Sequence, residues 1–274
     1  MSIANIFARS YASVTVAGVT DVQAVMDAID TLLKTTIPTV GDRWTEPVAD
    51  TYQSPADPVS GAYMKIAFVR ASALILNFSV VDHNGLGAGG GSIAPGSGTA
   101  IRVFAGPTHF HMRQLGATVN DNCATAFVAD PSPEAMNASN PVVFSRSNRA
   151  GGGGFNNITL EKFIGRDALP ASYQNRLSFP GYTSNPGAPN GTLLTAGGSE
   201  IAFPVFMSTF TSAANLGNNR GSGGCPQTVW VDAVHIEGNL IVVPIDTGVT
   251  AVFEVTNTIC DDNNGAARLA FRVA

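Results

Sequence analysis

The chain has 274 residues, and only 13% of them are Asp, Glu, Lys or Arg, about half the share in an ordinary soluble domain. A net charge of −5 without any run of basic residues argues against a general nucleic-acid-binding protein. No apolar stretch has the length of a transmembrane helix, and the start of the chain lacks the pattern of a signal peptide. We therefore expect neither a membrane nor a specific nucleic-acid sequence as a direct partner.

The shortage of charge predicts whether the protein is a monomer or part of an assembly. Hydrophobic residues make up 45% of the chain and glycine adds 29 residues, whereas there are only three lysines, Lys34, Lys65 and Lys162. A surface with so few charges is typical of a protein that is covered by other subunits. The composition therefore predicts a homo-oligomer or a subunit of a larger particle.

One helix is predicted near the start of the chain, over Asp21–Lys34. Thr20 and Gln23 have the spacing of a capping box, and an aspartate at position 21 suits the positive end of a helix. Apolar residues then recur at steps of three and four and form one stripe: Val22, Val25, Met26, Ile29, Leu32 and Leu33.

Four strands are predicted after this helix. Residues 63–70 and 73–81 are short and rich in β-branched and aromatic residues. Residues 99–104 and 108–115 flank the turn Ala105-Gly-Pro107, which is typical of a hairpin.

The middle of the chain, from about Asp130 to Gly224, is rich in Gly, Pro and Asn, with only short apolar pieces between them. A solvated linker would contain few aromatic residues, but this stretch contains several: Phe144, Phe155, Phe163, Tyr173, Phe179 and Tyr182. We predict a long loop-rich insertion that packs on a neighbouring subunit.

Four more strands are predicted near the end, at residues 228–237, 239–245, 251–256 and 268–273. At least eight short strands with regular turn signals indicate a mainly β fold. The prediction is one domain over residues 1–274, an antiparallel β-sandwich or open barrel with one N-terminal helix and long irregular loops.

His109 and His111 are the strongest metal-binding candidates. Residues i and i+2 of a strand share a face, so both imidazoles would reach one ion. A third ligand would be His83 or His235, but nothing in the sequence brings either of them near. We therefore predict a polar strand face that makes hydrogen bonds, with no metal and no cofactor.

Two glycine runs, at residues 86–92 and 151–154, invite comparison with a phosphate-binding loop. Neither run ends in Lys followed by Ser or Thr, and neither joins a strand to a clear helix. Flexible or closely approached loop tips explain both runs better.

Catalytic carboxylate pairs would come from Asp232 with Glu237, or from Asp261 with Asp262. The first two lie five residues apart and so point to opposite faces of a strand, and the other two lie in a turn. The chain contains no Gly-x-Ser-x-Gly motif for a serine nucleophile. We expect no catalytic residues and a protein that is not an enzyme.

Trp44 and Tyr52 lie in a proline-rich connection after the helix. They suggest either a platform on which a sugar stacks or, with more weight, a segment packed at a subunit contact. The three cysteines, Cys123, Cys225 and Cys260, are far apart and odd in number, which predicts free thiols in a protein made in a reducing cytoplasm.

The first 115 or so residues resemble virion structural proteins of tailed bacteriophages. The resemblance starts with the short helix and continues through segments 41–47 (Gly-Asp-Arg-Trp-Thr-Glu-Pro), 54–57 (Ser-Pro-Ala-Asp), 63–68, 82–85 (Asp-His-Asn-Gly) and 102–111. It implies a multimeric tail, collar or baseplate component that contacts itself and other virion proteins. It implies no site residues. The alternative is a carbohydrate-binding, adhesin-like module for receptor recognition.

Overall fold

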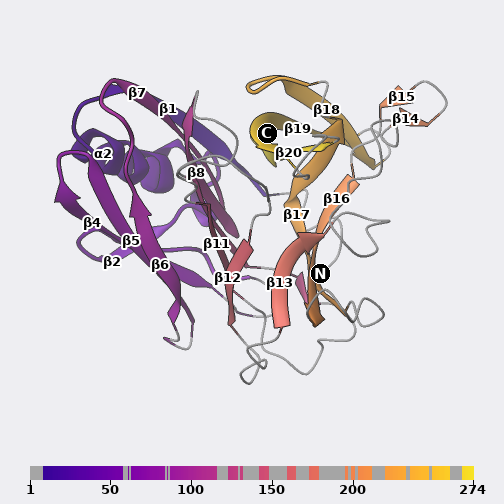
Figure 1. The fold of residues 1–274 in the computed structure, drawn as a ribbon, viewed down its shortest axis with the longest axis horizontal. Coiled ribbons are helices and arrows are strands. Elements are labelled where there is room, and N and C mark those ends of the chain that lie inside the picture. Colours follow the sequence, from indigo (N-terminus) through magenta and orange to yellow (C-terminus); the bar gives the residue numbers. More distant parts are fainter. Residues whose placement is uncertain are drawn as a thin grey trace.

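The computed structural model describes residues 9–57, 61, 63–83, 85, 87–115, 123–128, 130–131, 142–147, 159–164, 173–178, 195–196, 199–200, 203–211, 220–232, 235–246, 249–259 and 267–274. These residues form one α-helix and three antiparallel sheets (Figure 1). The prediction of a mainly β fold with one N-terminal helix is therefore confirmed. No helix in this described part is long and apolar enough to cross a membrane.

The α-helix α2 (Gln23–Thr31) continues into a π-helical turn, η1 (Leu32–Thr36), and a 3-10 turn, η2 (Val40–Asp42), follows. The predicted capping box is wrong, because no side chain caps the helix at its N-cap residue, Val22. Instead, the carboxylate of Asp21 accepts a hydrogen bond from the Gln23 N–H, at 2.9 Å, just before the first turn.

The largest sheet contains 13 strands. Their order is β1 (Ala12–Val19), β7 (Thr99–Gly106), β8 (His109–Leu115), β9 (Cys123–Val128), β11 (Val142–Ser147), β12 (Thr159–Ile164), β13 (Tyr173–Ser178), β16 (Phe203–Thr211), β17 (Arg220–Asp232), β20 (Ala267–Arg272), β19 (Val249–Ile259) and β18 (Leu240–Asp246), with β10 (Asp130–Pro131) on β17. The predicted hairpin is confirmed as β7 and β8, which pair from Ala100 with Leu115 to Gly106 with His109. The four predicted C-terminal strands correspond to β17 to β20.

A second sheet contains the five strands β2 (Thr45–Val48), β3 (Thr51–Gln53), β4 (Met64–Ser72), β5 (Ile75–Asp82) and β6 (Gly87–Ile93), and β14 (Thr195–Ala196) pairs with β15 (Ser199–Glu200). The glycine run at residues 86–92 is therefore largely an edge strand rather than a flexible loop tip. Gly89 and Gly90 pair with Val80 and Ser79 of β5.

The helix, the second sheet and the first strands of the largest sheet share one hydrophobic core. Phe110 of β8 joins them, because its ring lies 5.6 Å from Phe68 of β4 and 6.4 Å from Trp44, measured between ring centroids. The helix contributes its predicted apolar stripe to the same core: Val22, Val25, Met26 and Ile29, followed by Leu32 and Leu33 of η1.

The largest sheet curls, so that its C-terminal strands cover the face of β7 and β8 that points away from the helix. Phe104 of β7 stacks on Phe271 of β20, with 5.6 Å between ring centroids. This contact between β7 and β20 is the joint between the two parts of the sheet. A second core lies beside the joint and consists of Val229, Val231, Ala251, Phe253, Val255 and Ala270. In Figure 1 the helix and the C-terminal strands accordingly occupy different parts of the molecule.

The stretch from Asp130 to Gly224 is more regular than predicted. Its described residues include strands β10 to β16 and the start of β17. The sequence signal was weak because glycine and proline interrupt these strands, as in Phe203–Thr211 and Arg220–Asp232. The rest of the predicted insertion lies outside the described residues.

Candidate functional site

His109 and His111 lie on the inner face of the joint between the two parts of the sheet. Both are completely buried on β8, whereas Phe110 between them points into the helix core. The His111 ring stacks on Phe271 of β20 with 3.9 Å between centroids, and the His109 ring lies 6.2 Å from the same phenyl ring. The two imidazoles share a face, as predicted, but that face is packed against aromatic rings.

The surroundings keep both imidazoles uncharged. Burial lowers the pKa of His109 to about 3, with a further contribution from the positive charge of Arg272. Burial, followed by the charge of Arg113, lowers the pKa of His111 well below its ordinary value. Neither ring nitrogen of His109 has a hydrogen-bond partner among the described residues, so the predicted hydrogen bonds of this face are missing there.

The described residues do not bring a third metal ligand to this pair. His83 follows β5 and its ring lies 5.9 Å from that of Tyr63, and His235 comes after the end of β17. Within the described ranges, no three His, Cys, Asp or Glu residues are grouped as a metal site requires.

The other residues considered for chemistry are dispersed. Asp232 ends β17, and Glu237 forms an ion pair with the buried Arg113 at 3.0 Å. Asp261 and Asp262 lie outside the described residues, as do glycines 151–154 and Cys260. Cys123 and Cys225 belong to strands β9 and β17.

Trp44 and Tyr52 are buried in the chain's own core. The Trp44 Nε1–H donates a hydrogen bond to the Gly106 carbonyl at 2.9 Å, and the Tyr52 hydroxyl donates one to Asp30 Oδ1 at 3.1 Å. The sugar-stacking interpretation is therefore wrong, because neither ring has a face free for a sugar. That the segment lies at a subunit contact stays a prediction.

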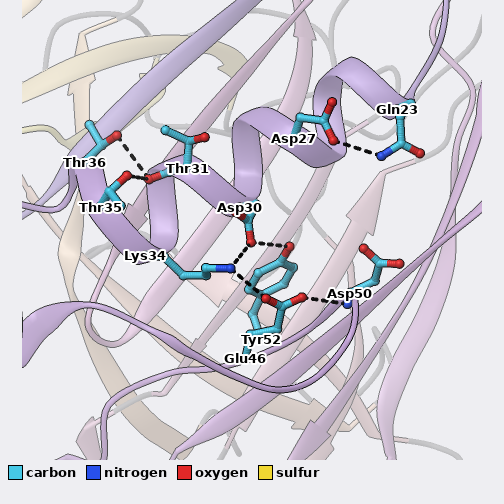
Figure 2. Close-up of polar contacts among 10 residues, drawn as sticks. All are labelled: Gln23, Asp27, Asp30, Thr31, Lys34, Thr35, Thr36, Glu46, Asp50 and Tyr52. Carbon is cyan, nitrogen blue, oxygen red and sulfur yellow. Dashed lines mark hydrogen bonds and ion pairs between the residues drawn. The ribbon is translucent and has the colours of Figure 1, made fainter.

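Polar side chains gather where the helix meets the β2–β3 hairpin (Figure 2). The Lys34 ammonium lies 2.7 Å from a carboxylate oxygen of Asp30 and 2.7 Å from one of Glu46. These two contacts, that with Asp30 first, raise the pKa of Lys34 to about 12. The second oxygen of Glu46 accepts the Asp50 N–H at 3.0 Å. One lysine thus bridges the two carboxylates and holds them in place, so the cluster fastens the hairpin to the helix.

The side chains of β18 form the most unusual surface. Leu240 is 64% exposed and Val242 60% exposed, whereas Ile241 between them and Val243 after them pack against the second core. Ile236, shortly before the strand, is also exposed. Exposed apolar residues are ordinary when scattered, but here they alternate along one strand.

The strand β18 is also an open edge of the sheet. It ends the strand order, and no described strand pairs with its outer side. Val252 of β19, the residue opposite Val242, donates its N–H to the Ala274 carbonyl (2.9 Å) and accepts from the Val273 N–H (2.8 Å). In an antiparallel pair, the main-chain groups of two opposed residues either bond to each other or both point away from the pair. The N–H and C=O of Val252 point away from β18, so those of Val242 point to the open side. Leu240 lies two residues earlier on the strand and therefore has the same orientation.

This surface was missed in the sequence, although residues 239–245 were predicted as a strand. Strand order depends on pairing between distant segments, which a local pattern does not contain. One signal was present: the strand is apolar at consecutive positions, Leu240 to Val243, rather than alternating as a strand with one wet face does.

Comparisons with known proteins identify no family for this chain. A scan against protein-family models finds no match, and a search of curated proteins finds no significant match.

Proposed function

We propose that the chain is a structural subunit of a bacteriophage particle that assembles as a homo-oligomer. The observation that supports this best is the open edge of β18 with its exposed Leu240 and Val242. An unprotected apolar edge is a liability for a free monomer, and natural proteins usually cover such edges. A chain with only 13% charged residues also offers few side chains to keep neighbouring copies apart.

The phage assignment is supported by the resemblance of the first 115 or so residues to tailed-phage virion proteins. Among particle components, the proposal favours the tail, collar or baseplate, with other virion proteins as further partners. The protein would be made in the cytoplasm of the bacterial host, where free cysteines remain reduced. No catalytic step is assigned to it.

No observation in the described part of the chain favours the carbohydrate-binding alternative. It depended on aromatic rings presented to solvent, and Trp44 and Tyr52 are both buried. Rings that bind a sugar by stacking must have one face free.

Size-exclusion chromatography with light scattering, followed by negative-stain microscopy, tests the proposal. We expect a discrete oligomer at micromolar concentration, visible as rings, tubes or small symmetric particles. A stable monomer at every concentration would contradict it. Binding of the purified protein to glycans, without self-assembly, would favour the adhesin-like alternative.

A further inference from the structure

We propose that β18 pairs with β18 of a second copy of this chain, antiparallel, about a two-fold axis that passes beside Ile241. This inference rests on the proposed function, because it specifies one contact of the oligomer. The occupant must be an extended strand, since the open edge presents main-chain donors and acceptors in alternation.

The main chain of β18 selects this register. With the axis at Ile241, Leu240 of one copy lies opposite Val242 of the other, and these are the residues whose N–H and C=O groups point outward. Each such pair exchanges two hydrogen bonds, so the two symmetric pairs satisfy all the outward groups of Leu240 and Val242.

Pro244 is compatible with the same register. It shares the outward orientation of Val242 but has no N–H to donate. The axis at Ile241 places it past Leu240, the first residue of the partner's strand, where Gly238 lies in a turn and its N–H already donates to the Val255 carbonyl at 2.8 Å. The ladder therefore ends where the chain runs out of free donors.

The side chains are self-complementary, as a two-fold contact requires. Leu240 and Val242 of each copy meet on the exposed face and cover one another. No charged residue lies between Gly238 and Ile245. Glu237, the acid that precedes the strand, lies in a turn in which the Asn239 N–H donates to the Ile236 carbonyl at 3.1 Å, and it forms an ion pair with Arg113 of its own chain.

A lysine substitution tests the contact, with a matched control elsewhere on the molecule. Val242 and Val69 of β4 are both valines and both 60% exposed. We expect Val242→Lys to lower the oligomer mass measured by light scattering and Val69→Lys to leave it unchanged. Urea unfolding of both variants checks that the fold is intact.

The outcomes separate the two proposals. An oligomer that persists in Val242→Lys, with wild-type mass, overturns the β18 contact while the structural role stands. A wild-type protein that is monomeric at all concentrations overturns the proposed function.

Cysteine cross-linking tests the register. In an antiparallel hydrogen-bonded pair the Cα atoms are about 5.5 Å apart, within the range of about 4.4–6.8 Å that disulfides need. Leu240→Cys and Val242→Cys, mixed and oxidised, should therefore give a cross-linked dimer. Each variant alone should give much less, because identical residues would be about 8–9 Å apart in this register.

The native cysteines require their own controls. Wild type and Val69→Cys, oxidised in the same way, give the background from Cys123, Cys225 and Cys260. Equal cross-linking in the mixture and in the separate variants, or none in the mixture, would overturn the Ile241 register.

Discussion

Arg102 of β7 forms an ion pair with Glu254 of β19, across 152 residues of sequence. The Arg102 Nε lies 3.0 Å from Oε1 of Glu254, and the same guanidinium donates to Ser13 Oγ at 2.8 Å and Thr15 Oγ1 at 2.9 Å. One side chain thus joins β1, β7 and β19. It lies at the joint where the curled sheet closes over the buried histidines, and it helps to hold the β18–β19 hairpin in place.

Removing this guanidinium should loosen the joint. Arg102→Gln leaves the carboxylate of Glu254, only 12% exposed, without its cation, and the expected loss is about 1.5–3 kcal/mol in the free energy of unfolding. The control is Arg70→Gln, because Arg70 pairs with Asp21 where both side chains are 41% exposed, and such pairs contribute about 0–1 kcal/mol. Urea unfolding measures both variants, and equal losses would show that the joint does not depend on Arg102.

Acid should destabilise the protein through its buried histidines. A histidine in the unfolded chain has a pKa near 6.5, whereas that of His109 in the folded protein is about 3. Between these pH values the unfolded state binds a proton that the folded state excludes. The contribution of His109 is therefore constant above pH 6.5 and declines as the pH falls towards 3, by about 1.4 kcal/mol per pH unit.

Urea unfolding between pH 7 and pH 4 checks this expectation. His109→Gln should have a flatter dependence of stability on pH than wild type, because the substituted side chain does not titrate. His235→Gln is the control, since that residue lies outside the buried cluster. A His109→Gln profile parallel to wild type would mean that other groups cause the acid sensitivity.

The sequence predicted the parts of this fold that local patterns control. The helix followed from its apolar stripe, and β4, β5, β7 and β8 followed from their composition and turns. β1 was not predicted, because Ala12–Val19 alternates only weakly, and the short β2 and β3 were not predicted either. The curl of the sheet could not be predicted, because it depends on contacts such as Phe104 with Phe271 between distant segments.

The candidate residues were chosen by chemical type, and their burial was invisible in the sequence. His109, His111, Trp44 and Tyr52 each looked functional because polar or aromatic groups often bind ligands. Their burial arises from the second sheet and the C-terminal strands that cover them. The exposed face of β18 was hidden for the opposite reason, since its apolar residues looked like core.

Tyr52 should ionise only at strongly alkaline pH. Burial raises the pKa of its hydroxyl well above the usual value near 10, and the negative charge of Asp30 raises it further. Spectrophotometric titration should find a late component that Tyr52→Phe removes and Tyr63→Phe retains. Because the folded state favours the protonated hydroxyl, its contribution to stability is complete below pH 10 and is lost as the pH rises beyond that. A titration curve unchanged by Tyr52→Phe would contradict this.

Among the glycines whose surroundings the structure describes, Gly106, the last residue of β7, is the most closely approached. A Cβ added there would lie 2.4 Å and 2.6 Å from ring carbons of Tyr11 and 3.0 Å from His109 Nδ1. The Gly106 carbonyl also accepts the Trp44 indole N–H, so the backbone cannot retreat without stretching that bond. Gly106→Ala should therefore lower the free energy of unfolding by about 1–3 kcal/mol, as overpacking does.

The matched control is Gly41→Ala in the 3-10 turn, where an added Cβ meets no atom within 4 Å. This change should be neutral, or stabilising by less than about 1 kcal/mol, because alanine restricts the unfolded chain more than glycine does. Urea unfolding of the two variants under identical conditions makes the comparison. If Gly106→Ala proved as stable as Gly41→Ala, the Tyr11 ring would have room to move aside. The joint between β7 and the C-terminal strands would then be looser than its contacts indicate.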